Sequence, residues 1–319
     1  MGDDHVLIYG AGPIGVAFAA AFAPHCQITL VDPDADRRAS VPARLEDARA
    51  AMALAGRKTG GEVQVREAPA QGARFAKTGA TLVLDCGPEH LETKRAMLRA
   101  ALALPGLPVI ATASSAIPMS HILPDAADQA RALVAHPVNP PSVLRLIELV
   151  PAPGTLPATI DRAEHIFTAA GFRPVRLTRE TEGFVLNRLQ GAVLREAYRL
   201  VDDCVITPAD LDLVMTEGLG PRWSLSGPFE TADLNTAGGI AAHAARMGPA
   251  YARMGAERGE PPATWSPELV AQVAAARRAV LPLNALPERA AWRARAVAQI
   301  IALRDRLLAE APTHRNPDR

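Results

Sequence analysis

The sequence has few cysteines, no excess of charge and no long apolar run. Its three cysteines, Cys26, Cys86 and Cys204, are too few and too widely spaced for a disulfide framework or a cysteine metal site, which favours a reducing cytoplasm. The 34 basic residues balance 34 acidic residues, so no basic field exists to attract nucleic acid or an anionic membrane. No run of about 18 apolar residues predicts a membrane-spanning helix.

The chain is long enough for more than one domain. It has 319 residues, of which 49% are hydrophobic, and single hydrophobic cores rarely grow beyond about 250–300 residues. We find no internal repeat of fixed period. The eight histidines form no cluster with cysteines or acids at the spacing of metal ligands, so we predict no metal site.

The N-terminal part alternates strand and helix patterns around a glycine motif. Residues 5–10 read HVLIYG, a short apolar strand that ends in glycine, and an alanine-rich helical run follows to about residue 23. A second strand, 27–31, ends at Asp32. The motif GAGPIG lies between the first strand and the helix. Strand, G-x-G-x-x-G, helix, strand and acid in this order are typical of a dinucleotide-binding unit.

Each glycine of this motif has a physical role. Gly10 permits a tight turn, Gly12 lets the backbone approach a pyrophosphate, and Gly15 allows close packing of helix and strand. The helix N-terminus directs its partial positive charge at the phosphates. The Asp32 carboxylate can bind a ribose 2′-hydroxyl and would repel a 2′-phosphate, which favours NAD over NADP. The predicted cofactor contacts here are Gly10, Gly12, Pro13, Ile14, Gly15 and Asp32.

Two further predicted strands each end in polar residues. Carboxyl ends of strands form the ligand edge of a doubly wound sheet. Glu89 and Lys94, which follow the predicted strand 81–86, are therefore placed to touch the cofactor. Alternatively, they are ordinary charges in the first turn of a helix. Ser114 and Ser115, which follow the second strand, can donate to a substrate oxygen or merely cap a helix.

His136 and Glu148 lie on either side of a proline-rich turn. An apolar run, 132–134, precedes His136, and a second run, 146–150, carries Glu148 in its middle. A charge inside an apolar strand is costly to bury alone, and His136 is the nearest partner in the sequence. A carboxylate bonded to one imidazole nitrogen frees the other nitrogen to act as a base. The alternative is that His136 caps a loop and Glu148 points to solvent.

After about residue 178 the alternation of strand and helix stops. No later segment has a strand pattern, and from residue 186 apolar positions recur at helical spacing. The sequence therefore predicts an α/β protein, with an N-terminal Rossmann-type doubly wound sheet in residues 1–180 and an all-α domain in residues 181–319. Asn187, at the start of the first long helix, is either a structural polar group or an amide directed at an interdomain cleft.

Together these motifs resemble the L-3-hydroxyacyl-CoA dehydrogenase superfamily. The resemblance covers nearly the whole chain, and it is carried by GAGPIG, Ser114-Ser115, His136-x-x-Asn139-Pro140, Glu148 and GFVLNR. Within the superfamily the chain is most similar to the L-gulonate 3-dehydrogenase or lambda-crystallin branch, through AHPVNPP, IELVP, GFVLNRLQ, DLDLVMTEGLG and GPFET. The CoA-dependent branch has two aromatic residues after the histidine, where Pro137 and Val138 stand here. Residues 40–80 match least well.

The resemblance implies a role for each candidate residue. His136 would be the catalytic base, and Glu148 the carboxylate that orients it. Ser114 or its neighbour Ser115 would contact the reacting oxygen, and Asn187 would hold substrate and nicotinamide. The resemblance further implies that the helical domain forms a homodimer and that the cofactor contacts include Asp32, Glu89 and Lys94.

These roles predict an NAD-dependent enzyme that oxidises the 3-hydroxyl of a small hydroxy acid, with L-gulonate as the expected substrate. An acid needs a carboxylate anchor, for which the guanidinium of Arg222, expected in a loop between glycine-containing turns, is the candidate. Alternatively, Arg222 is a surface residue. Two other functions stay open: a 3-hydroxybutyryl-CoA or carnitine dehydrogenase, and a non-catalytic, crystallin-like NAD-binding protein. The predicted substrate-binding residues are Ser114, Ser115, Asn187 and Arg222.

Overall fold

The computed structural model describes residues 4–68, 79–259 and 266–310. The chain divides into two compact units, Met1–Arg195 and Glu196–Arg319, and the division falls within a helix, α7 (Leu186–Asp202). The domain boundary placed after residue 180 from the sequence stays a prediction. None of the described helices is long and apolar enough to cross a membrane.

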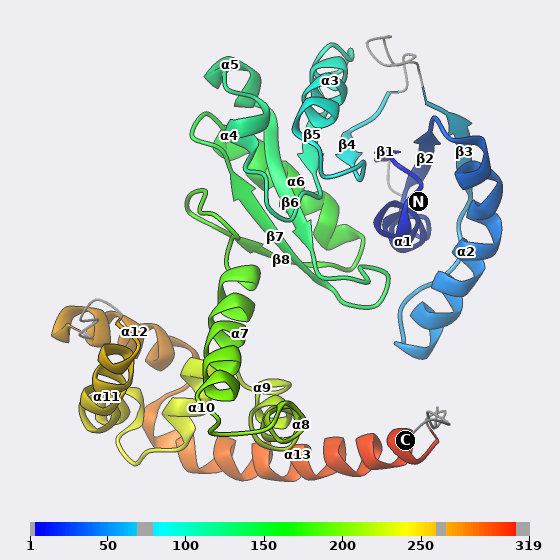
Figure 1. The fold of residues 1–319 in the computed structure, drawn as a ribbon. Coiled ribbons are helices and arrows are strands. Elements are labelled where there is room, and N and C mark those ends of the chain that lie inside the picture. The colour runs from blue at the N-terminus through cyan, green and yellow to red at the C-terminus, as the bar shows by residue number, and fades with distance from the viewer. Residues whose placement is uncertain (1–3, 69–78, 260–265, 311–319) are drawn as a thin grey trace. The chain divides into compact units, whose positions relative to one another are not determined.

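The first unit is built on one twisted sheet of eight strands (Figure 1). Across the sheet the order is β3-β2-β1-β4-β5-β6-β7-β8, and all neighbouring pairs are parallel except β6 and β7, which are antiparallel. The strands are β1 (His5–Tyr9), β2 (Gln27–Asp32), β3 (Val63–Glu67), β4 (Leu82–Asp85), β5 (Val109–Thr112), β6 (Ala132–Pro137), β7 (Leu146–Pro151) and β8 (Arg173–Arg176). The predicted fold class is confirmed, but β3 was not predicted from the sequence.

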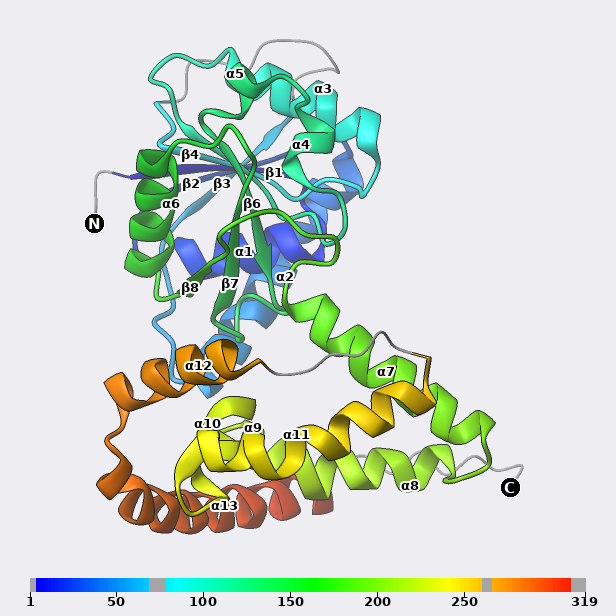
Figure 2. The same ribbon diagram turned by 90° about the vertical axis from the view of Figure 1, so that its left-hand side faces the viewer.

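Helices cover both faces of this sheet (Figure 2). Alternate residues of the strands pack against α1, α2 and α6 on one face and against α3 and α4 on the other. Because both faces are covered, the central strands are almost continuously apolar. The helices of this unit are α1 (Pro13–Phe22), α2 (Ala35–Leu54), α3 (Leu91–Leu102), α4 (Met119–Ile122), α5 (Ala126–Gln129) and α6 (Pro157–Ala169).

Phenylalanine is concentrated at one place in the core. Of the seven phenylalanines in the chain, Phe18, Phe22, Phe167 and Phe172 pack together with ring centroids 5.4–6.3 Å apart. Aromatic rings at these separations attract each other beyond the effect of their burial. This cluster fastens α1 and α6 to each other on the face of the sheet opposite α3.

A buried arginine ties three segments of the first unit together. The guanidinium of Arg57 donates to the carbonyl oxygens of Pro141 at 2.8 Å and Ser142 at 2.7 Å, and reaches the carbonyl of Ala170 at 3.4 Å. It also lies over the Phe172 ring, 5.0 Å from the centroid. Because Pro141 and Ser142 belong to the turn between β6 and β7, Arg57 holds the turn that joins the strands of His136 and Glu148.

Every regular element in the described residues of the second unit is a helix or a helical turn. It contains the end of α7, then α8 (Pro208–Leu213), a π-helical turn (Val214–Leu219), α9 (Gly220–Trp223), α10 (Pro228–Leu234), α11 (Gly239–Glu257), α12 (Pro267–Val280), a 3₁₀ turn (Leu283–Ala285) and α13 (Leu286–Ala309). Asp233 of α10 is completely buried. Its carboxylate accepts the amide of Ile240 at 2.8 Å and pairs with Arg277 and Arg278 of α12, which ties three helices of this unit to one charge.

Candidate active site

His136 and Glu148 face each other across the antiparallel pair of β6 and β7. The strand register places them directly opposite, and the Nδ1 atom of His136 lies 2.7 Å from the Oε2 atom of Glu148. Both side chains are buried, so the alternative in which Glu148 points to solvent is wrong. An ionised carboxylate only accepts hydrogen bonds, so Nδ1 carries a hydrogen, and in a neutral imidazole the Nε2 atom then has a free lone pair. The pair therefore has the arrangement that a general base requires.

The second oxygen of Glu148 binds the beginning of α7. Its Oε1 atom accepts the backbone amides of Val185 and Leu186, each at 3.0 Å. Burial raises the pKa of Glu148, but the hydrogen bonds from His136 and from these two amides outweigh burial and leave the pKa below its ordinary value. Sequence patterns gave no sign of the contact with α7, because the amides belong to a distant segment.

Ser114, Ser115 and Asn187 are also brought together. The Ser114 hydroxyl is completely buried and donates to Glu89, whose position at this loop the sequence did not indicate. The carbonyl oxygen of Ser115 accepts the side-chain amide of Asn187 at 3.1 Å. Since Asn187 follows directly on the amides that bind Glu148, the serine loop and the His136–Glu148 pair meet at the first turn of α7.

Lys94 lies in a buried polar cluster with Asp85 and Thr112. Its ammonium is 2.9 Å from the Oδ2 atom of Asp85 and 3.4 Å from the hydroxyl of Thr112, which itself donates to Asp85 at 2.8 Å. The Lys94 side chain is only 1% exposed. Asp85 was missed by sequence reasoning, although it carries the signal that singled out Glu148, a carboxylate in an apolar strand.

The glycine motif forms an open cradle at the N-terminus of α1. Gly10 has a left-handed conformation with φ of 103°, and a side chain there would meet the carbonyl oxygen of Cys86 at 2.6 Å. A side chain on Gly15 would lie 1.8 Å from the carbonyl oxygen of Gly10. At Gly12 nothing lies within 4 Å, so open space remains above the helix N-terminus, where no side chain caps α1. These features fit a pyrophosphate group.

Asp32 closes the cradle at the end of β2. It is buried, and its two oxygens accept the amides of Ala11 at 2.7 Å and Asp34 at 2.9 Å. Each oxygen keeps a second acceptor position, so a ribose hydroxyl can still bind. Arg38 is directed at the carbonyl oxygens of Asp32 and Pro33, both at 2.8 Å, so it is not a free partner for a 2′-phosphate. This arrangement fits NAD.

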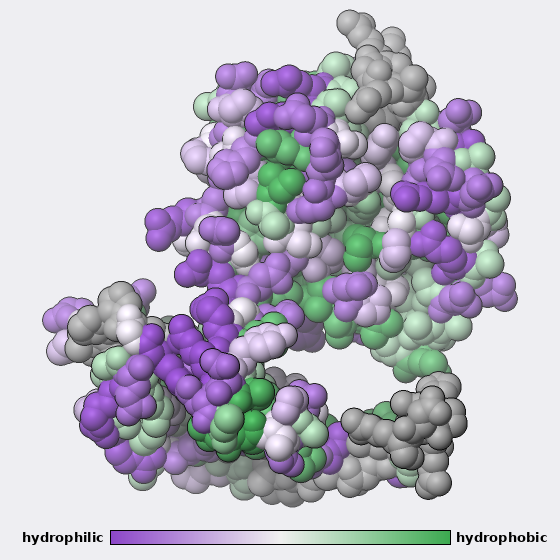
Figure 3. Space-filling model, in the orientation of Figure 1, coloured by the Kyte–Doolittle hydropathy of each residue, from purple (hydrophilic) through white to green (hydrophobic). Residues whose placement is uncertain are grey.

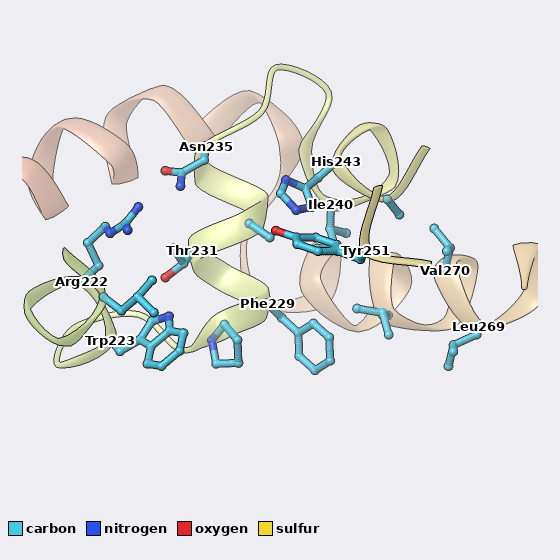
Figure 4. A pocket seen from close by; sticks show the side chains of 15 residues that line it. Arg222, Trp223, Phe229, Thr231, Asn235, Ile240, His243, Tyr251, Leu269 and Val270 are labelled. Atoms are coloured by element: carbon cyan, nitrogen blue, oxygen red, sulfur yellow. The ribbon is translucent and has the colours of Figure 1, made fainter. Parts of the chain in front are cut away.

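Arg222 belongs to the helical unit, whereas the other candidates belong to the sheet unit. It lies in the short helix α9 and not in a loop as predicted, because the helix continues through Gly220 from the preceding π-helical turn. Its Nε atom donates to the carbonyl of Gly218 at 3.0 Å. Arg222 lines a largely apolar cavity of about 400 Å³ together with Trp223, Phe229 and Tyr251 (Figure 4).

Within the described ranges, no three histidine, cysteine, aspartate or glutamate side chains gather in a way that could hold a metal ion. The polar groups that do gather lie at one edge of the sheet. The glycine cradle follows β1, Asp85 ends β4, Thr112 ends β5 and His136 lies near the end of β6, and these four strands are parallel. Ligands of doubly wound sheets bind at this edge.

Two family models together match most of the chain, from residue 5 to residue 279. The model described as 3-hydroxyacyl-CoA dehydrogenase, NAD binding domain, matches residues 5–181. The model described as 3-hydroxyacyl-CoA dehydrogenase, C-terminal domain, matches residues 183–279. The matches meet next to Gly183-Phe184-Val185, where the chain leaves the sheet for α7.

Curated relatives agree with these matches. A lambda-crystallin homolog of Bos taurus is 48% identical over 166 residues, which is 52% of either chain. The lambda-crystallin of Oryctolagus cuniculus is 36% identical over 242 residues, 73% of this chain and 75% of the relative. An L-carnitine dehydrogenase of Streptomyces griseus is 36% identical over 240 residues, 75% of this chain and 71% of the relative. The chain thus spans about half to three quarters of the length of these relatives.

A solved structure shares the fold. The crystal structure of 5-formyl-3-hydroxy-2-methylpyridine 4-carboxylic acid 5-dehydrogenase superposes with a TM-score of 0.70 over 92% of this chain and 99% of that chain. The two sequences are 23% identical, so this likeness concerns the fold alone.

The lowered pKa of Glu148 predicts a specific loss of stability in acid. A carboxyl whose pKa is lower in the folded than in the unfolded state stabilises the fold above the unfolded value, ordinarily about 4.5, and this stability is lost as the pH falls through the folded value. We expect the midpoint temperature of thermal unfolding to decrease as the pH is lowered below about 4.5. In Glu148→Gln this decrease should be smaller. The exposed Glu46→Gln is the control; an unchanged acid profile for Glu148→Gln would contradict the assignment.

Proposed function

The chain belongs to the 3-hydroxyacyl-CoA dehydrogenase family of NAD-dependent oxidoreductases, and we propose that it oxidises L-gulonate at C3 to 3-dehydro-L-gulonate. The observation that carries the proposal is the buried His136–Glu148 pair at the same sheet edge as the glycine cradle. The choice of substrate is supported by the lambda-crystallin relatives and by the AHPVNPP motif, in which Pro137 and Val138 replace the aromatic residues of the CoA-dependent branch.

In the proposed mechanism the residues of the chain move one proton and hold the substrate. The Nε2 atom of His136 removes the proton of the C3 hydroxyl, while Glu148 stabilises the imidazolium that forms. Ser114 and Asn187 position the substrate oxygen. Bound at the glycine cradle, NAD would supply the acceptor for the hydride that leaves C3. Its proposed contacts are the glycine cradle (Gly10, Gly12, Pro13, Ile14 and Gly15), Asp32 and Glu89, with Lys94 acting through Glu89.

L-carnitine is the second candidate substrate, because a relative with 36% identity is an L-carnitine dehydrogenase. Reduction of NAD should be measured with L-gulonate, L-carnitine, L-3-hydroxybutyrate and L-3-hydroxybutyryl-CoA. The highest kcat/KM is expected on L-gulonate. Preference for carnitine or for the thioester would reject L-gulonate as substrate. NAD binding without turnover of any of the four would leave the non-catalytic alternative as the better account.

The role of His136 predicts a large loss of turnover without loss of cofactor binding. Since positioned proton transfer contributes about 100- to 10,000-fold, we expect His136→Ala to lower kcat by at least 100-fold. NADH affinity, followed by fluorescence titration, should remain nearly unchanged. The exposed His165 of α6 provides a matched control, and His165→Ala should keep wild-type turnover. Wild-type turnover in His136→Ala would show that the base lies elsewhere.

We propose Arg222 as the anchor of the substrate carboxylate, supplied by the same or by a second subunit. A guanidinium binds a carboxylate through two parallel hydrogen bonds, whereas an ammonium is a point charge. Arg222→Lys should therefore raise the KM for L-gulonate by about tenfold, equivalent to about 1.4 kcal/mol of binding, with a smaller effect on kcat. The exposed Arg253→Lys is the matched control. An unchanged KM in Arg222→Lys would remove this residue from the site.

We propose that the protein is a homodimer joined through α7 and its helical unit. No residue of α7 is buried, although the helix is strongly amphipathic. Its exposed apolar side chains include Leu189, Leu194 and Tyr198, and further apolar residues lie at the surface of the helical unit (Figure 3). Exposed apolar surface of this extent is typical of an interface. Sedimentation equilibrium should give the mass of two chains; the mass of one would reject the dimer.

A further inference from the structure

The Glu89 carboxylate gathers the donors of one short loop. Its Oε1 atom accepts the hydroxyl of Ser114 and the backbone amides of Ser115 and Ala116, both at 3.1 Å. The same Ser114 hydroxyl oxygen accepts the amide of Ile117 at 2.8 Å. Four consecutive residues of the loop, 114–117, are therefore fixed directly or through one atom by a single carboxylate that lies on a different segment.

The second carboxylate oxygen of Glu89 faces a lysine that is itself part of a buried ion pair. The ammonium of Lys94 lies 3.5 Å from the Oε2 atom of Glu89 and 2.9 Å from Asp85. The Lys94 and Asp85 side chains are 1% and 2% exposed, whereas that of Glu89 is 42% exposed. Asp85 is fixed in turn, because its other oxygen accepts the amide of Gly87 at 2.9 Å. The cation that faces Glu89 thus comes from the rigid interior of the sheet domain.

We propose that Glu89 is a positioning residue of the active site, which fixes the 114–117 loop and the direction of the Ser114 hydroxyl and is itself held by Lys94. This inference rests on the proposed function. It goes beyond the cofactor contact proposed above, because a contact alone needs neither the three donors on Oε1 nor an ion pair between Oε2 and the buried Lys94.

The direction of the Ser114 hydrogen follows from simple donor and acceptor counting. A hydroxyl has one hydrogen, and an ionised carboxylate only accepts. Partial burial raises the pKa of Glu89, but the hydrogen bond from Ser114, the charge of Lys94 and the loop amides outweigh it, so the pKa lies below its ordinary value. At neutral pH the Ser114 hydrogen therefore points to Glu89, and the remaining lone pair of its oxygen is the group left for another partner.

Glu89 also reaches Asn187 through the loop. The amide of Ser115 binds Glu89, and the carbonyl oxygen of Ser115 accepts the side-chain amide of Asn187. A loop that moves when Glu89 is removed would therefore shift both groups that position the substrate oxygen in the proposed mechanism. A displacement of about 1 Å in such groups can cost about 100-fold in rate.

Hydrogen–deuterium exchange tests the structural part without any need for activity. In Glu89→Ala the amides of Ser115 and Ala116 lose their acceptor, so the peptide that covers 114–117 should exchange about tenfold faster. Glu92→Ala is the matched control, since Glu92 lies three residues further on, in the first turn of α3, with a side chain 70% exposed that pairs with Arg95. Glu89→Gln, which keeps the shape of the side chain, provides a second variant. Exchange in Glu89→Ala equal to that of Glu92→Ala would overturn the proposal.

A double-mutant cycle tests the catalytic part. We expect Glu89→Ala to lower kcat at saturating NAD by about 10- to 100-fold, because saturation with NAD removes any effect of cofactor affinity from kcat. Because Glu89 acts in part through Ser114, the loss of kcat in the pair Glu89→Ala/Ser114→Ala should be smaller than the product of the two single losses. Effects that multiply, or a loss of NADH affinity with normal kcat, would reject the positioning role. A wild-type protein inactive on every substrate would refute the proposed function, and the exchange experiment alone would then decide the role of Glu89.

Discussion

A single carboxylate, that of Glu148, joins the sheet, the candidate base and the first turn of α7. One oxygen faces His136 and the other holds the amides of Val185 and Leu186. This is possible because the antiparallel register of β6 and β7 sets residues 136 and 148 opposite each other. A shift of one residue in one strand would turn its side chain to the opposite face of the sheet, separate the pair and misplace the apolar neighbours that now fill the core. The packing of the strands therefore protects the geometry of the site.

The same edge of the sheet contains a second buried carboxylate, which is stabilised by different partners. Asp85 is neutralised by the ammonium of Lys94 and further bonded by Thr112 and Gly87. An isolated charge in such a position would be very costly to bury. Removal of one partner of a buried ion pair therefore destabilises a protein more than replacement of both partners by apolar residues. Glu148 is stabilised by an imidazole and two amides, which leaves the site with an imidazole nitrogen, Nε2 of His136, that can take up a proton.

Sequence patterns predicted the parts of the site that depend on local order. GAGPIG between a strand and a helix identified the cradle, and a carboxylate within an apolar strand identified Glu148. The contacts that were missed join residues far apart in the chain: Arg57 with the turn at Pro141, Glu148 with Val185, and Glu89 with Ser114. No periodicity encodes such contacts, because they depend on how strands and helices pack. The strand β3 was also missed, since its exposed edge position requires few apolar residues.

The contact between Glu148 and α7 has a consequence for where an acceptable substrate can carry its negative charge. The N-terminus of a helix ordinarily offers free amides and a partial positive charge to an anion. In α7 a resident carboxylate already takes these amides, so a foreign anion near the reacting carbon meets repulsion there. Electrostatics at this end thus disfavour a 2-hydroxy acid, whose charge adjoins the carbon to be oxidised. They favour acids that keep at least one further carbon between the two.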